Sequence, residues 1–74
     1  MAKLPAISGK SLVRALEKGG FVIRRQSGSH ILLEHSDGRV TVVPVHGNRD
    51  LPMGTLKAVL RDIDITVEQL RELL

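Results

Sequence analysis

The sequence contains no cysteine, no tryptophan, no tyrosine and only one phenylalanine, Phe21. Without cysteine the chain cannot form disulfides, thiolate metal sites or cysteine nucleophiles, and we expect a cytoplasmic rather than a secreted protein. RRM and OB folds bind single-stranded RNA by stacking bases on several exposed aromatic rings, a platform that one ring cannot form. Any contact with RNA is therefore expected to involve phosphates, sugar hydroxyls and shape.

Long hydrophobic runs are also absent. The first residues contain no apolar stretch suited to a signal peptide, and no segment approaches the roughly 20 apolar residues that span a membrane. At 74 residues the sequence is too short for a Rossmann unit or a P-loop NTPase core. We expect a single domain over residues 1–74 that makes no contact with a membrane.

The charge is unevenly distributed along the chain. Residues 1–49 carry 8 basic and 3 acidic residues, a net charge of +5, whereas residues 50–74 carry 3 basic and 5 acidic residues, a net charge of −2. A basic segment of this kind attracts polyanions such as nucleic acid, although charge of this size also serves ordinary solubility.

The first periodic segment predicts a helix over residues 9–18. Ser8 is a suitable N-cap, and two glycines end the helix, with Gly19 expected in the left-handed position that follows many helices. The apolar face of this helix consists of Leu12, Val13, Ala15 and Leu16.

Three β-prone runs follow, over residues 21–26, 30–34 and 39–44. A turn at residues 27–29 separates the first two runs, and Asp37-Gly38 is a strong hairpin signal between the second and the third. We therefore expect an antiparallel meander of three strands, the last of which ends at its proline.

After a loop over residues 45–51, a second helix is expected, with Asp50 or a neighbour as its cap and Pro52 in its first turn. Thr66 and Gln69 match the capping-box pattern at the start of a short terminal helix. The order α-β-β-β-α predicts an α+β two-layer sandwich, with a three-stranded antiparallel sheet covered by helices on one face, as in double-stranded RNA-binding domains.

The alternation of the strands leaves apolar residues on both faces of this sheet. Ile31, Leu33 and His35 share one face, whereas His30 and Leu32 lie on the other. Because the helices cover only one face, the apolar residues of the second face indicate an interface with a partner or a second copy of the chain, unless they are ordinary exposed residues.

Among the three histidines, His30 has the most suggestive surroundings. It follows a turn and lies close to Arg24 and Arg25, and a tight turn would place Arg25 nearly opposite it. An imidazole accepts the proton of a ribose 2′-OH at neutral pH, and arginines hold the phosphate, so metal-free cleavage of RNA is one interpretation. The other is a polar residue that starts a strand.

The remaining histidines give weaker signals. His35 is expected to face solvent at a strand end, on the face opposite His30, so the two cannot share a metal ion, and we expect no metal or other cofactor. His46 lies in a loop that the meander brings beside His30. It is a second proton-transfer group, a substrate contact or simply a loop residue.

The chain resembles the HicA toxins of HicA–HicB toxin–antitoxin pairs over nearly its whole length. The resemblance is carried by residues 16–21 (LEKGGF), 25–30 (RQSGSH), 35–39 (HSDGR), 43–47 (VPVHG) and 51–56 (LPMGTL). The sequence departs from the family pattern at Asp64, where a glycine usually precedes the Ile-Thr start of the last helix. Aspartate tolerates a left-handed conformation better than most residues do.

The resemblance implies a fold similar to the double-stranded RNA-binding domain and the activity of an mRNA interferase, a metal-independent endoribonuclease that blocks translation. It implies His30 as the active residue and a HicB-type antitoxin that occludes the site and binds DNA, so that this chain contacts DNA only indirectly. The residues expected to contact RNA are Lys3, Lys10, Arg14, Arg24, Arg25, Gly28, Ser29 and His46. The alternatives are a non-catalytic RNA-binding module and a protein-interaction module of the same fold.

Overall fold

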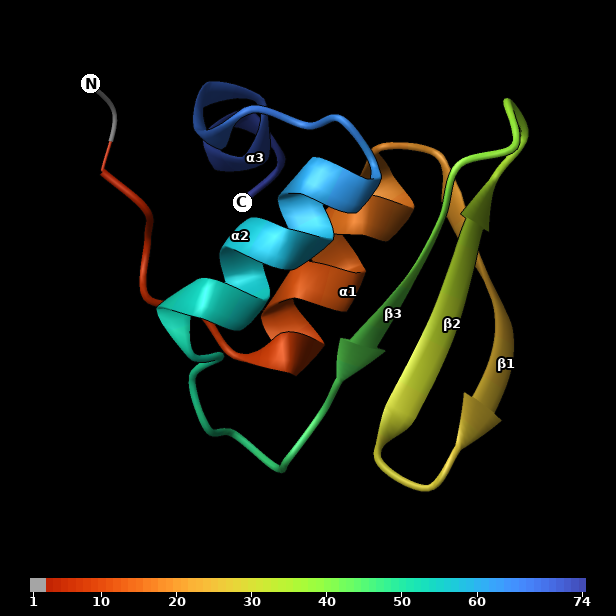
Figure 1. Ribbon diagram of the computed structural model, residues 1–74, viewed down its shortest axis with the longest axis horizontal. Coiled ribbons are helices and arrows are strands. Elements are labelled where there is room, and N and C mark those ends of the chain that lie inside the picture. The colour runs from red at the N-terminus through yellow and green to blue at the C-terminus, as the bar shows by residue number, and fades with distance from the viewer. Residues whose placement is uncertain (1–2) are drawn as a thin grey trace.

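A computed structural model describes residues 3–74; Met1 and Ala2, which the expected domain of residues 1–74 includes, lie outside the described part. The sheet is antiparallel with the strand order β1-β2-β3, and the helices lie together on one of its faces (Figure 1). This arrangement confirms the predicted α+β two-layer sandwich. The elements are α1 (Gly9–Lys18), β1 (Phe21–Ser27), β2 (His30–His35), β3 (Val40–Pro44), α2 (Met53–Asp62) and α3 (Val67–Leu73).

Helix α1 begins and ends where the sequence predicts. The Ser8 hydroxyl accepts a hydrogen bond from the amide of Ser11 at 3.1 Å, which confirms the N-cap. The prediction for Gly19 is wrong: its φ is −83°, and Gly20, with a φ of +97°, is the left-handed residue. Gly19 still donates to Ala15 and Leu16, so the helical turn includes it and the reversal comes one residue later.

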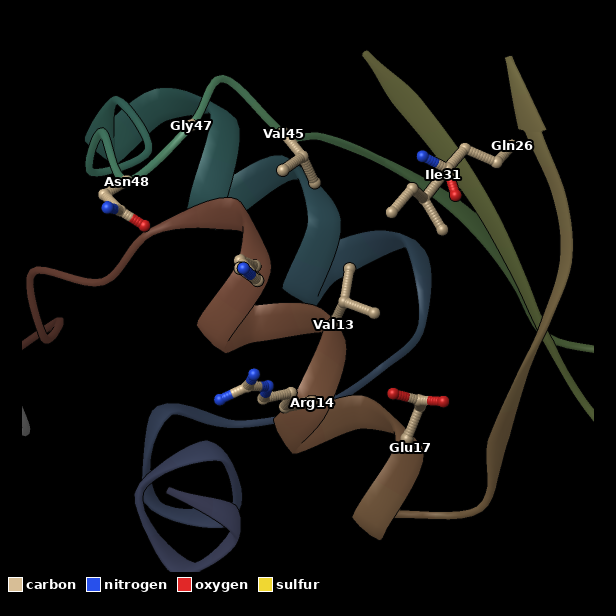
Figure 2. Close-up of a pocket in the computed structure, with 9 residues that line it drawn as sticks. Val13, Arg14, Glu17, Gln26, Ile31, Val45, Gly47 and Asn48 are labelled. Carbon is tan, nitrogen blue, oxygen red and sulfur yellow. The ribbon is translucent and has the colours of Figure 1, made fainter. Parts of the chain in front are cut away.

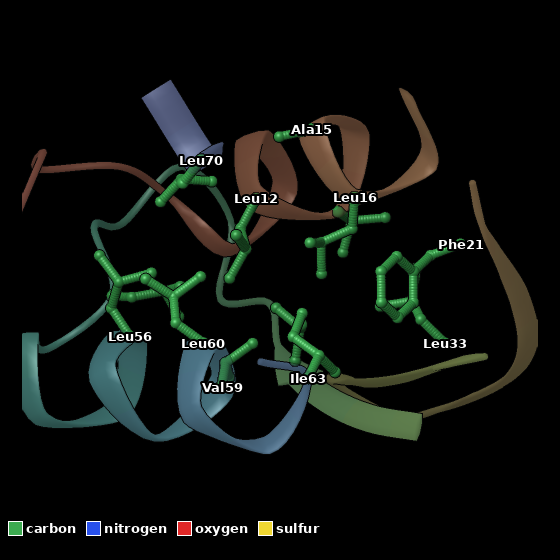
Figure 3. Packing of buried hydrophobic residues seen from close by; sticks show 13 residues of the cluster. Leu12, Ala15, Leu16, Phe21, Leu33, Leu56, Val59, Leu60, Ile63 and Leu70 are labelled. Carbon is green, nitrogen blue, oxygen red and sulfur yellow. The ribbon is translucent and has the colours of Figure 1, made fainter. Parts of the chain in front are cut away.

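The core lies between the helices and the inner face of the sheet. Figure 3 shows Leu12 and Leu16 of α1 facing Val59 and Leu60 of α2, with Phe21 and Leu33 beside them. All of the predicted apolar face of α1 is buried, and so are Leu56, Val59 and Leu60 of α2. The fully buried side chains are Leu12, Leu16, Leu33, Val43, Leu56, Ile63 and Leu70.

The start of α2 differs from the prediction. Pro52 is the N-cap and no side chain caps the helix, whereas Asp50 forms an isolated bridge with Ser8. Asp50 is therefore fixed by pairing with the start of α1. The capping box of α3 is confirmed, since Thr66 accepts from the amide of Gln69 and the Gln69 side chain accepts from that of Thr66.

Asp64 adopts the left-handed conformation expected for the position where the family has glycine, with a φ of +55°. It lies in the short connection between α2 and α3. Among residues 3–74, no helix has the length and apolar character needed to cross a membrane.

The two sheet faces differ as the alternation predicts. Thr41 and Val43 of β3 are buried against the helices, whereas Val40 and Val42 are 45% and 46% exposed on the outer face. The outer face of β1 and β2 carries Val22 and Leu32 as well, because they pair with Glu34 and Arg25 on that face. The outer sheet face therefore carries apolar side chains that no other element within residues 3–74 covers.

A cluster at the β2–β3 turn ties the sheet to the helices. The Arg39 guanidinium lies 5.2 Å from the centre of the Phe21 ring and donates to the main-chain carbonyl of Ile63 at 2.6 Å. Arg39 also pairs with Asp37 at 2.9 Å, and this hydrogen bond holds the pKa of the Asp37 carboxyl below its usual value.

The prediction that His35 faces solvent is wrong. Its ring contacts Phe21 edge to face, with 5.0 Å between the ring centres, and its side chain is only 21% exposed. The inward direction follows from the alternation, because His35 pairs with the buried Phe21 across the β1–β2 ladder. His35 is a packing residue whose Nδ1 accepts from the amide of Asp37.

Candidate functional site

The candidate site is built at the β1–β2 turn. Gly28 and Ser29 form a two-residue connection, in which Gly28 has a φ of +58°, as the first position of a type II′ turn requires. This short turn pairs Ser27 with His30 and Arg25 with Leu32. The prediction that a tight turn places Arg25 nearly opposite His30 is wrong, because the two-residue turn sets Ser27 opposite His30. Arg25 instead lies diagonally from His30 on the same outer face.

A bulge in β1 brings both arginines to that face. Ile23 pairs with Leu33 and Arg25 pairs with Leu32, so Arg24 is an extra residue in the ladder. The Arg24 Nε donates to the Glu34 Oε1 at 3.1 Å, and Glu34 belongs to the outer face. Arg24 is thereby neutralised by a carboxylate, whereas Arg25 has no ion pair within residues 3–74.

His30 and Arg25 line the same shallow hollow on the outer sheet face. The hollow has a volume of about 310 Å³, and Ser27, Leu32 and Val42 complete it. His30 is exposed, so its imidazole is accessible to a large substrate. A proton acceptor next to an unpaired cation is an arrangement suited to a phosphodiester, whose phosphate the guanidinium attracts.

The structure brings the chain segment before His46 beside His30 but not His46 itself. Pro44 pairs with His30, and the Val45 amide donates to the Ser29 carbonyl at 2.6 Å. His46 lines a separate hollow near the start of α2, together with Arg49, Asp50 and Thr55.

The other predicted RNA contacts lie elsewhere. Lys10 and Arg14 of α1 line a cleft on the inner side of the sheet. Figure 2 shows Arg14 on this helix. The main-chain carbonyl of Lys3 accepts a hydrogen bond from Arg71 of α3. Only Arg24, Arg25, Gly28 and Ser29 share the hairpin of His30, so the predicted set falls into separate surfaces.

A family model described as the HicA toxin of bacterial toxin–antitoxin matches residues 9–65. The chain belongs to the HicA toxin family. The matched region contains the whole sheet, α1 and α2, and with them the His30 hollow. Membership implies an antitoxin partner. A comparison with curated proteins finds no match.

Three residues of the HicA hollow, Ser27, Leu32 and Val42, were not predicted as site residues. Leu32 and Val42 form its apolar side, one from the middle strand and one from β3. The alternation already placed Leu32 on the face of His30, so this residue was detectable from the sequence. The place of Val42 in the hollow could not be predicted in the same way, because it depends on the register of β3, which pairs Val42 with Leu32.

No metal centre accompanies the hollow in the part of this HicA chain that the structure describes. Within residues 3–74, His, Cys, Asp and Glu side chains form no group of three or more that could hold a metal ion.

Proposed function

We propose that this HicA chain is an endoribonuclease toxin that cleaves mRNA in the cytoplasm, with His30 as the proton-transfer group. The observation that carries the proposal is that His30 lines one open hollow on the outer sheet face together with Arg25, which has no ion pair among the described residues 3–74. Family membership supports the toxin role.

In the proposed reaction His30 accepts the proton of a ribose 2′-OH. The 2′-oxygen then attacks the adjacent phosphorus, the bond between phosphorus and the 5′-oxygen breaks, and a proton from the imidazolium reaches the leaving oxygen. The products are a 2′,3′-cyclic phosphate and a 5′-hydroxyl. Arg25 stabilises the additional negative charge on the phosphate as the new bond forms.

The substrate is a flexible single strand. Attack by the 2′-oxygen requires it to lie in line with the leaving oxygen, and a rigid duplex does not allow this geometry. The hollow is shallow and open, and its apolar side consists of the aliphatic residues Leu32 and Val42. Such a surface holds the backbone in place without a stacking platform, in agreement with the single aromatic residue of the chain.

A HicB-type antitoxin is proposed to cover this hollow, and any contact with DNA is made through that partner. Val22, Val40 and Val42 are 49%, 45% and 46% exposed on the same face as His30. Exposed apolar side chains that border a site are typical of a surface that another protein covers. The partner would thereby exclude RNA from His30 by occupying the outer sheet face.

The test is an RNA cleavage assay with the purified protein, a long mRNA and EDTA in the buffer. We expect the wild type to produce fragments with 2′,3′-cyclic phosphate ends, and His30→Ala to produce none while its circular dichroism spectrum is unchanged, because His30 is exposed. Cleavage by His30→Ala at the wild-type rate would contradict the mechanism. Salt-sensitive RNA binding without products would instead identify a non-catalytic RNA-binding module.

A further inference from the structure

A cleft lies between α1 and the inner side of the β1–β2 hairpin, behind the hollow that contains His30. Its volume is about 380 Å³, within the range of sites for small ligands. Figure 2 shows Gln26 and Ile31 of the hairpin on one side, Val13 and Glu17 of α1 facing them, and Asn48 of the following loop on the opposite side from Gln26, with Val45 between them.

The floor of this cleft is aliphatic. Val13 is 5% exposed, and Ile31 and Val45 are partly buried and pack against the core. These three side chains are held by the fold, so they present a fixed apolar surface. Packing the flat face of a nucleobase against such a surface removes apolar area from water, which is favourable even where no aromatic ring is available for stacking.

The side-chain amides and cations around the floor have no hydrogen-bond or ion-pair partner among residues 3–74. The amides of Gln26 and Asn48 make no side-chain hydrogen bond within residues 3–74, and each offers both a donor and an acceptor. Arg14 forms no ion pair there with Glu17, one turn away, and Lys10 is likewise unpaired over the described residues. Amides match the edge of a base, and free cations match the phosphates on either side of it.

The cleft and the His30 hollow share one end of the hairpin. Gln26 pairs with Ile31, and the next pair towards the turn is Ser27 and His30. Because neighbouring residues of a strand point to opposite faces, Ile31 faces the cleft and His30 faces the hollow. A strand of RNA that crossed the turn at Gly28 would reach both. The space there is open, because beyond the adjacent residues no described atom lies within 4 Å of the position of a Cβ at Gly28.

We infer that this cleft binds one base of the RNA next to the nucleotide cleaved at His30, and that Gln26 and Asn48 form hydrogen bonds with that base from opposite sides of the cleft. Lys10 and Arg14 hold the flanking phosphates. The inference rests on the proposed function. Recognition of an unstacked base through its edge is the usual way in which proteins read single-stranded RNA. In this chain the residues of the cleft, on the inner side of the sheet, would therefore determine which RNA sequences are cleaved at His30.

The first experiment compares the cleavage sites of the wild type and the double variant Gln26→Ala/Asn48→Ala on a pool of RNA with randomised sequence. We expect the wild type to prefer certain bases at one position near the cut. The double variant should lose that preference, with a decrease of roughly tenfold in cleavage of the preferred sequence, because a good pair between an amide and a base discriminates by about that factor. An unchanged cleavage pattern would overturn the inference.

The second experiment measures binding without cleavage, in the His30→Ala background, with short RNA oligonucleotides of defined sequence. Adding Lys10→Ala/Arg14→Ala should weaken binding of all sequences and lower the slope of affinity against salt by about 2, one for each lost phosphate contact. The matched control is Lys57→Ala/Arg61→Ala, a pair of cations one turn apart on α2 that does not line the cleft. Equal effects of the two pairs would contradict the inference.

The two proposals fail in different ways. A wild-type protein that cleaves no RNA contradicts the proposed function, and the binding experiment still decides whether the cleft holds RNA. A wild type that cleaves, together with cleft variants that keep both its cleavage pattern and its affinity, contradicts the cleft inference alone.

Discussion

Arg25 lies diagonally across the β1–β2 ladder from His30, because the two-residue turn pairs His30 with Ser27. Diagonal neighbours in a sheet are about 7–8 Å apart, which a long side chain can bridge. A phosphate between the two residues would contact the guanidinium while its neighbouring 2′-OH contacts the imidazole. The two arginines of the hairpin therefore differ in their availability to a phosphate, because the preceding residue, Arg24, is paired with Glu34.

Arg25→Ala should lower the rate of RNA cleavage by about 100-fold, the usual cost of losing one group that stabilises charge in the transition state. Arg24→Ala is the matched control, because it removes the same charge from the adjacent residue but from a guanidinium that already contacts a carboxylate. We expect less than about a fivefold decrease for the control, as for the loss of a peripheral charge. Single-turnover cleavage of a defined oligonucleotide measures both, and equal losses would show that Arg25 has no special position.

Arg39→Ala should destabilise the fold without a direct effect on the chemistry. The substitution leaves the Ile63 carbonyl without its donor and removes the contact with Phe21. We expect the free energy of unfolding in urea to decrease by about 1–3 kcal/mol. Arg49→Ala removes an equal charge from a side chain that forms no hydrogen bond within residues 3–74, and it should change stability by less than about 0.5 kcal/mol.

The prediction for Arg39 depends on the planar guanidinium and not on charge alone. Arg39→Lys should therefore recover only part of the lost stability, because an ammonium group neither stacks on a ring in the same way nor forms the same fork of hydrogen bonds. Full recovery by lysine would show that charge alone accounts for the role of Arg39.

Two glycines at helix starts should respond oppositely to alanine. A Cβ at Gly9 would lie 2.1 Å from the main-chain oxygen of Pro44, so Gly9→Ala must displace the start of α1 from the end of β3 and destabilise the protein. A Cβ at Gly54, early in α2, meets no atom within 4 Å, and Gly54→Ala should stabilise by about 0.5–1 kcal/mol. Thermal unfolding of both variants measures the difference in stability. A higher melting temperature for Gly9→Ala than for the wild type would contradict the close approach of Gly9 to Pro44.

Local signals in the sequence determined the elements of this fold. Ser8, Gly19-Gly20, Asp37-Gly38 and the capping box at Thr66 mark helix ends and a turn through interactions within a few residues, so their positions could be predicted. The errors at Gly19 and Asp50 are shifts of one and two residues at such boundaries. They arise because helix ends adjust to tertiary contacts, as the pairing of Asp50 with Ser8 illustrates.

The sequence by itself thus determined the order of helices and strands, the buried stripes and the face on which His30 lies, because periodicity and caps are properties of neighbouring residues. Only the tertiary structure decided the surroundings of each side chain. Strand register set Ser27 opposite His30, the bulge turned Arg24 towards Glu34, and the packing of α1 placed Lys10 and Arg14 behind the sheet. These relationships join residues distant in sequence, and a shift of one residue in pairing would change all of them.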